Sequence, residues 1–179
     1  MGAGKSAALL QAAFNYEEMD QKVAVFTATV DDRYGVGKVT SRLGISRDAK
    51  VFDDKTDFIA IGEQCGGVAC LLIDEAQFLS QDQVKQLHRV AHSKRNLPSI
   101  CFGIRSDFRG DAFPGSAMLL TLADSIEELK TICTCGSKAS MNMRLDATGR
   151  RVTDGAQVQI GGNESYRSAC PRCFYAAAE

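Results

Sequence analysis

The first six residues, MGAGKS, end in Gly4-Lys5-Ser6, which are the last three positions of the phosphate-binding pattern G-x-x-x-x-G-K-[ST]. In such a loop, backbone amides and the lysine hold the phosphates of a nucleotide, and the final hydroxyl binds Mg²⁺. The first glycine of the pattern and the strand that should lead into it are missing from the sequence. The tripeptide alone therefore leaves open whether it is part of a nucleotide site or a chance match.

The stretch LLIDEAQF at 71–78 is typical of the other half of a nucleotide site. An apolar strand that ends in Asp74 places a carboxylate at the edge of a sheet, where it would help to hold Mg²⁺, and Glu75 follows where a base would meet a nucleophile. An Asp-Glu pair at a strand end is, by itself, more often a strand cap. Combined with Gly4-Lys5-Ser6 and the helix expected after it, the pair predicts a nucleotide site.

Four of the seven cysteines form two close pairs, Cys133-x-Cys135 and Cys170-x-x-Cys173. Two such pairs supply the four sulfur ligands that tetrahedral zinc prefers, and a site filled by four protein ligands is structural and not catalytic. Bound zinc would also add folding free energy to a small segment rich in loops. The alternative is four buried or disulfide-linked cysteines. The remaining cysteines lie in or beside apolar runs and are expected to be small core residues: Cys65, Cys70 and Cys101.

An alternating pattern of elements must position these residues. Residues 5–19 are rich in Ala and Leu and contain no Gly or Pro, which predicts a helix directly after Gly4. Continuous apolar runs at 22–30, 68–76 and 99–105 predict strands buried on both faces. Helical stripes lie between the second and third run and after the third, at 81–92 and 116–130. Strands that alternate with helices predict a parallel α/β sheet with its ligand loops at the carboxyl ends of the strands.

From about residue 131 the composition changes to small, polar, glycine-containing segments bracketed by the cysteine pairs. This change predicts two domains, a nucleotide-binding domain at 1–130 and a small zinc-binding domain at 131–179. The net charge of -1 and the scattered basic residues give no indication of nucleic-acid binding. No apolar run approaches the roughly 20 residues of a membrane span, and no secretory signal is visible, so a cytoplasmic location is expected.

Together the motifs resemble the zinc-containing, cytosolic and bacterial type of thymidine kinase, the type II family. The matching stretches span nearly the whole chain in the family's order, and in the family the phosphate loop has two more residues and a preceding strand. We therefore expect the chain to be an N-terminally truncated copy in which Met1 is an internal residue of the loop. The matches are MGAGKS, DDRYG at 31–35, LLIDEAQF, SDFRGDAF at 106–113, the two cysteine pairs and QIGGNESY at 159–166.

The resemblance implies a P-loop, RecA-like parallel sheet with helices on both faces and a C-terminal zinc-binding lasso domain. It implies transfer of phosphate from ATP to the 5′-hydroxyl of thymidine, which gives dTMP for DNA synthesis by nucleoside salvage. Mg²⁺ with ATP, structural Zn²⁺, feedback inhibition by dTTP and a homotetramer belong to the same expectation. The alternative is a RecA-like P-loop ATPase with a zinc ribbon, in which Glu75 would activate water. A non-catalytic zinc module that binds nucleic acid or protein is a weaker alternative.

The resemblance also assigns roles to residues. Glu75 matches the general base that takes the proton of the 5′-hydroxyl. Lys5 matches the lysine on the β- and γ-phosphates, Ser6 a Mg²⁺ ligand, and Asp74 the carboxylate that orders the metal. The other positions assigned to ATP, phosphate or magnesium are Gly2, Ala3, Gly4, Asp31, Arg33 and Gln77.

The nucleoside pocket of the family is built from aromatic side chains and the lasso loop. Read without the family, Phe108 and Phe113 would be ordinary core residues. The loop at 141–165 is long, and fixing both its ends near one metal site would reduce the entropy lost when nucleoside binds. The positions assigned to the nucleoside are Met1, Phe78, Ile104, Phe108, Phe113, Asn142, Gln159, Ile160, Gly161 and Tyr166.

Overall fold

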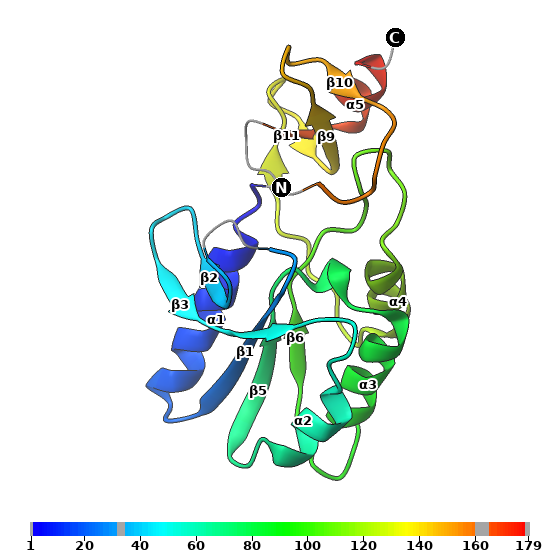
Figure 1. Cartoon of the computed structure of the whole chain (residues 1–179). Coiled ribbons are helices and arrows are strands. Elements are labelled where there is room, and N and C mark those ends of the chain that lie inside the picture. Colours follow the sequence, from blue (N-terminus) through cyan, green and yellow to red (C-terminus); the bar gives the residue numbers. More distant parts are fainter. Residues whose placement is uncertain (1, 32–34, 160–164, 178–179) are drawn as a thin grey trace.

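A four-stranded parallel sheet forms the centre of the computed structural model, which describes residues 2–31, 35–159 and 165–177 (Figure 1). All three predicted strands are present, but each ends before its apolar run does. The fourth strand, at the edge, is only three residues long and was not predicted. In spatial order the strands are β4 (Lys50–Phe52), β1 (Lys22–Ala28), β5 (Val68–Ile73) and β6 (Ser99–Cys101).

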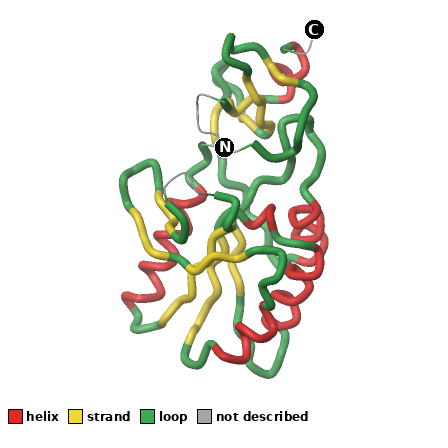
Figure 2. Tube along the Cα trace, in the orientation of Figure 1, coloured by secondary structure: helices red, strands yellow, loops and turns green. Residues whose placement is uncertain are grey.

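Helices cover both faces of the sheet, as predicted (Figures 1 and 2). One face carries α1 (Lys5–Glu18), which begins directly after Gly4, and its Leu9 packs with Val25 and Leu72 of the central strands. The other face carries α2 (Phe58–Gln64), α3 (Gln81–Ala91) and α4 (Pro114–Leu122). A strand alternates its side chains between the two faces, so neighbouring residues of β1 and β5 enter different clusters.

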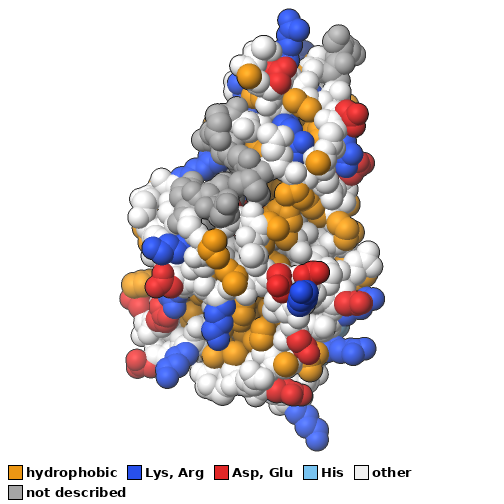
Figure 3. Space-filling view, viewed as in Figure 1, with side chains coloured by type: hydrophobic (Ala, Val, Ile, Leu, Met, Phe, Trp, Pro, Cys, Tyr) orange, Lys and Arg blue, Asp and Glu red, His pale blue; other side chains and the backbone are white. Residues whose placement is uncertain are grey.

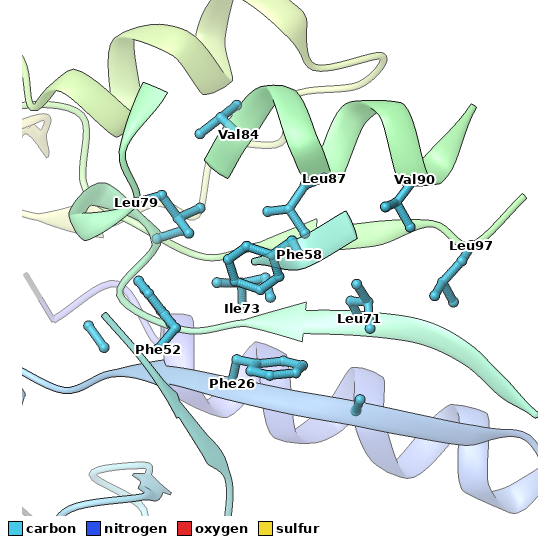
Figure 4. Close-up of a cluster of buried hydrophobic side chains, with 13 residues drawn as sticks. Phe26, Phe52, Phe58, Leu71, Ile73, Leu79, Val84, Leu87, Val90 and Leu97 are labelled. Carbon is cyan, nitrogen blue, oxygen red and sulfur yellow. The ribbon is translucent and has the colours of Figure 1, made fainter. Parts of the chain in front are cut away.

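The larger of the two clusters lies between the sheet and α3 (Figure 4). Phe58 packs edge-on against Phe26, with ring centroids 5.7 Å apart, and lies 6.1 Å from the ring of Phe52. Leu87 and Val90 reach this cluster from α3. Each such side chain, fully buried, contributes roughly 1.5 to 3 kcal/mol. The cluster therefore anchors β5, whose carboxyl end carries Asp74 and Glu75.

The helix predicted at 116–130 is shorter than expected. It begins at Pro114, a residue suited to the first turn, and ends at Leu122. Beyond that point the chain has no apolar face to bury, since Ile126 is exposed. Segment 123–130 instead connects α4 to the C-terminal part of the molecule.

The C-terminal part contains a hairpin, a three-stranded antiparallel sheet and a short helix. Its own buried cluster combines Met143, Ala169 and Phe174 with two of the four paired cysteines, and a third, partly buried, packs against it. The division into domains at about residue 131 stays a prediction. The elements are β7 (Thr131–Ile132) and β8 (Lys138–Ala139), the sheet of β10 (Arg151–Val152), β9 (Met141–Leu145) and β11 (Tyr166–Ala169), and α5 (Pro171–Ala176).

The remaining described elements are a hairpin of β2 (Lys38–Thr40) with β3 (Ser46–Asp48), and a 3-10 turn η1 (Ala76–Phe78) after β5. Basic and acidic side chains are interspersed on the face shown in Figure 3. None of the described helices is long and apolar enough to cross a membrane.

Candidate functional site

The phosphate loop and the acidic pair meet in space although they are far apart in sequence. The Ser6 hydroxyl donates a hydrogen bond to Asp74 Oδ2 at 3.2 Å. The amide of Asp74 donates to the carbonyl of Phe26 in β1, so the residue continues the sheet by one position. Gly4 adopts a left-handed conformation, with φ 75°, immediately before α1. The start of α1, where free amides and the helix dipole favour anions, therefore lies beside the Asp74 carboxylate.

Asp74 is a buried carboxylate, with 3% of its surface exposed. Burial raises its pKa to about 6, the nearby charge of Glu75 adds to this effect, and Lys5 and Ser6 oppose it. Its Oδ1 atom has no hydrogen-bond partner among the described residues. A buried oxygen without a partner, beside a serine hydroxyl, suits a hard cation such as Mg²⁺. The residues present therefore fit the expected metal.

Glu75 lies half-buried in a strained conformation, with φ 51° and ψ 40°. Left-handed backbone is rare for residues other than glycine and is often found at functional sites. The side-chain amide of Gln77 donates to Glu75 Oε2 at 2.5 Å, and Gln77 Oε1 accepts from the amide of Ile104 at 3.2 Å. Gln77, assigned above to ATP or magnesium, therefore contacts Glu75 and the residues beyond β6.

A cleft of about 550 Å³, open to solvent, lies between the sheet and the C-terminal part. The rings of Phe78 and Phe113 meet edge-on, with centroids 5.9 Å apart. Phe108 is only 1% exposed, so its ring belongs to the packing beneath the cleft. Ten of the positions predicted from sequence line the cleft together: Asp31, Glu75, Gln77, Phe78, Ile104, Phe108, Phe113, Asn142, Gln159 and Tyr166.

The other predicted residues lie around the phosphate loop or outside the described part of the chain. Gly2 lies close to the C-terminal part, because a side chain built there would come within 3.8 Å of Arg42 Nη1 and Ser168 Oγ. Lys5 is the first residue of α1. Ala3 precedes Gly4 in the loop. Four predicted positions fall outside the described residues: Met1, Arg33, Ile160 and Gly161.

Asp107 is a residue of the cleft that the sequence reasoning missed. Its buried carboxylate accepts the amides of Arg109, Gly110 and Asp111 and also a hydrogen bond from Gln157 Nε2 at 3.2 Å. Burial alone would raise the pKa of Asp107, but the hydrogen bonds from Arg109, including its guanidinium, and from Asp111 and Gln157 hold it below the usual range. An aspartate followed by a glycine three residues later is typical of such a turn, and this was the available signal.

The two cysteine pairs converge on one cluster, as predicted. The sulfur atoms of Cys133, Cys135, Cys170 and Cys173 all lie within 4.8 Å of one another, and Cys135 Sγ is 3.6 Å from Cys170 Sγ. Four sulfurs at about 2.3 Å from one zinc ion would lie about 3.8 Å apart. None of the seven cysteines is in a disulfide. The geometry therefore fits a metal and not the disulfide alternative.

The protonation of these thiols also fits a cation. Backbone hydrogen bonds from Cys135 and Cys170 lower the pKa of Cys133 to about 6, which favours the thiolate that binds metal. Contacts with the other three sulfurs raise the pKa of Cys173 to about 12. Four adjacent sulfurs cannot all ionise in the absence of positive charge, and Zn²⁺ would supply that charge.

The fold and the site define a P-loop nucleotide-binding protein of the α/β class with an attached four-cysteine segment. A sequence profile described as thymidine kinase matches residues 1–174. The thymidine kinase of Chromobacterium violaceum is 58% identical over 175 residues, which is 98% of this chain and 94% of that protein. The thymidine kinase of Albidiferax ferrireducens is 56% identical over 98% of this chain and 88% of its own length. The thymidine kinase of Pasteurella multocida is 52% identical over 95% of this chain and 90% of its own length. The chain belongs to the thymidine kinase family.

Proposed function

We propose that this protein transfers the γ-phosphoryl group of ATP to the 5′-hydroxyl of thymidine and so produces dTMP for nucleoside salvage. One observation carries the proposal. Glu75 lies in the wall of the aromatic cleft, while the preceding residue, Asp74, contacts Ser6 of the phosphate loop. An acceptor bound in the cleft and a phosphate bound at the loop would therefore meet at the end of one strand. Membership of the family supports thymidine as the acceptor.

The nucleoside would bind between aromatic walls. Phe78 and Phe113 offer an edge-on pair of rings, and Tyr166 of β11 also lines the cleft. Flat rings pack against a pyrimidine base over a large apolar area. Polar groups of Asn142 and Gln159, which also line the cleft, would hydrogen-bond the base and fix its orientation.

Glu75 would act as the general base. As the 5′-oxygen forms its bond to the γ-phosphorus, the hydroxyl proton passes to the Glu75 carboxylate, and the bond from phosphorus to the β-phosphate oxygen breaks to release ADP. The hydrogen bond from Gln77 holds the carboxylate in place, and the neutral amide adds no charge beside it. Glu75 is therefore both half-exposed to the cleft and fixed in direction.

The phosphates of ATP would lie over the start of α1. The amides of Gly2 to Ser6 and the ammonium of Lys5 would hold them there, because dipole and charge both favour anions at that end of the helix. Asp74 and Ser6 would hold Mg²⁺, which when bound with ATP neutralises charge on the phosphates. Asp31, at the edge of the cleft, would lie near the transferring group.

Zinc at the four cysteines would be structural. It would join the β7–β8 hairpin to α5 at one point and so fix both ends of the polypeptide that supplies Asn142, Gln159 and Tyr166 to the cleft. We further propose the division into domains at 1–130 and 131–179, a homotetramer, a cytoplasmic location and feedback inhibition by dTTP, all by resemblance to the family.

The test uses the purified protein with γ-labelled ATP and thymidine, deoxyuridine or deoxycytidine. We expect label in dTMP, and ADP formation that depends on the added nucleoside. Phosphate release from ATP at the same rate with and without nucleoside would instead favour the ATPase alternative, with water activated by Glu75.

A further inference from the structure

Arg144, on β9, is a buried arginine that lies directly behind the nucleoside cleft. It is 3% exposed, and its guanidinium carbon lies 3.8 Å from the ring centroid of Phe108 and 5.4 Å from that of Tyr166. No carboxylate among the described residues forms an ion pair with it. The charge is instead compensated by aromatic faces and hydrogen bonds, which suits the planar, weakly hydrated guanidinium better than an ammonium.

The side-chain hydrogen bonds of Arg144 go to two places, the backbone at 156–157 and the hydroxyl of Tyr166. Nη1 donates to the carbonyl of Ala156 at 2.8 Å, and Nη2 donates to that of Gln157 at 3.2 Å. Nε and Nη2 also donate to the hydroxyl oxygen of Tyr166, at 3.0 and 2.9 Å. One rigid fork of donors therefore fixes Tyr166 and the backbone at 156–157 relative to each other.

These two bonds also set the direction of the Tyr166 hydroxyl. A hydroxyl oxygen has two lone pairs, and both are directed toward donors of Arg144. The single hydroxyl proton is then left to donate to the carbonyl of Gln159, which lies 2.8 Å away. Arg144 thus holds a third carbonyl of the same segment through Tyr166.

Arg144 does not line the cleft, but Phe108, Gln157, Gln159 and Tyr166 do. We propose that Arg144 is a positioning residue that fixes the 156–159 segment and Tyr166 in the shape that receives the nucleoside. It acts through these residues and contacts neither substrate. The kinetic part of this inference rests on the proposed function, whereas the structural part does not.

Arg151, on the neighbouring strand β10, provides a matched control. Its guanidinium carbon lies 3.7 Å from the ring centroid of Phe174, and its Nη1 donates to the carbonyl of that residue. Arg151 is therefore also an arginine stacked on an aromatic ring of the same small sheet. These contacts are with Phe174 of α5, and Arg151 is not among the residues that line the cleft, so its loss should affect stability and not the nucleoside site.

The experiment compares Arg144→Gln, Arg144→Lys and Arg151→Gln with the unsubstituted protein. We expect Arg144→Gln to raise the KM for thymidine about tenfold or more, since several charge-assisted bonds are lost, while the KM for ATP changes less than about threefold. Lysine cannot stack and donate in a fork, so Arg144→Lys should also raise the KM for thymidine. Arg151→Gln should leave that KM within about twofold, whatever its effect on Tm.

A second measurement needs no activity. Without nucleoside, the amides at 153–159 should exchange hydrogen for deuterium faster in both Arg144 variants and at an unchanged rate in Arg151→Gln. An unchanged thymidine KM in the Arg144 variants of an active enzyme, or an equal rise in Arg151→Gln, would overturn the positioning role. If the unsubstituted protein phosphorylates no nucleoside, the proposed function fails, and the exchange rates still decide whether Arg144 anchors the segment.

Discussion

Replacing Asp74 with asparagine should make the metal-free protein more stable and almost inactive. The carboxylate is buried and beside the charge of Glu75, and its pKa of about 6 lies above the ordinary value of 3.8. Because the pKa is raised in the folded state, protonated Asp74 is more compatible with the fold than ionised Asp74. The stability that protonation gives is fully present below about pH 4 and is lost as the pH rises through about 6. At neutral pH the ionised Asp74 therefore destabilises the fold, as expected for a buried carboxylate kept for the proposed metal.

The size of the effect follows from the shift in pKa. A rise from 3.8 to about 6 corresponds to roughly 3 kcal/mol of lost stability at pH 7.5. The asparagine amide would place a donor where Oδ1 has no partner, which costs about 1 to 2 kcal/mol. The net gain is about 1 to 2 kcal/mol, or a Tm higher by roughly 3 to 6 °C for a chain of this size.

Thermal unfolding in magnesium-free buffer, without a chelator that would strip zinc, measures this gain. The advantage of Asp74→Asn should shrink by about 1.5 kcal/mol between pH 7.5 and pH 5, because the unsubstituted Asp74 becomes protonated. The exposed Asp54→Asn is the matched control and should leave the Tm unchanged at every pH. Thymidine phosphorylation by Asp74→Asn should fall by on the order of 10² or more, since the metal loses its carboxylate.

Two results would refute this reasoning. If Asp74→Asn has the same Tm as the unsubstituted protein at pH 7.5, the buried carboxylate is not under electrostatic strain. If its advantage grows as the pH falls, the sign of the shift in pKa is wrong. Full activity of the variant would remove Asp74 from the metal site without affecting the stability argument.

Three further predictions concern the base, the zinc and the inhibitor. Glu75→Gln should lower phosphoryl transfer by on the order of 10² or more while ATP binding by calorimetry stays nearly unchanged, because the change removes only basicity; wild-type turnover would exclude Glu75 as the base. Metal analysis of protein purified without added zinc should give about one zinc per chain, and Cys170→Ser should lower both this ratio and the Tm. A folded, active chain without metal would contradict a structural role. Thymidine triphosphate should compete with both substrates and slow hydrogen exchange at 153–159 more than ATP does, since one molecule would contact both the cleft and the phosphate loop. Binding without competition against thymidine would rule out this bridged mode.

Much of the fold could be predicted because the signals are local. The helix at 5–18 and the strands at 22–28, 68–73 and 99–101 follow from composition and continuous apolar runs. The edge strand β4 could not be predicted, since three residues are too few to show a hydrophobic pattern and its pairing with β1 is set by tertiary contact. The helical pattern at 123–130 failed because periodicity alone does not show whether a partner surface exists.

The candidate site, like the fold, could be predicted where its signals are local and not where they depend on distant contacts. Motifs of fixed spacing predicted the loop, the acidic pair and the cysteine cluster, and the resemblance to the family supplied the aromatic positions. Arg144 acts through contacts with residues 12 or more positions away, and no local pattern marks such partners. The turn at Asp107 has a local signal, but its bond from Gln157, 50 positions away, has none. The link from Gln77 to Glu75 is local, but only the left-handed backbone at Glu75 brings the two side chains together.

That backbone conformation gives two adjacent carboxylates different surroundings, which suit the different roles proposed for them. Asp74 still belongs to the sheet, because its amide bonds to Phe26, and its side chain points to Ser6 in a buried setting. At Glu75 the chain turns with φ 51° into η1, which places this carboxylate in the open cleft beside Gln77. A buried carboxylate without its full set of partners suits a metal, and a half-exposed one fixed by an amide suits proton transfer. Under the proposed function, the left-handed turn at Glu75 would separate metal binding from base catalysis within two positions of the chain.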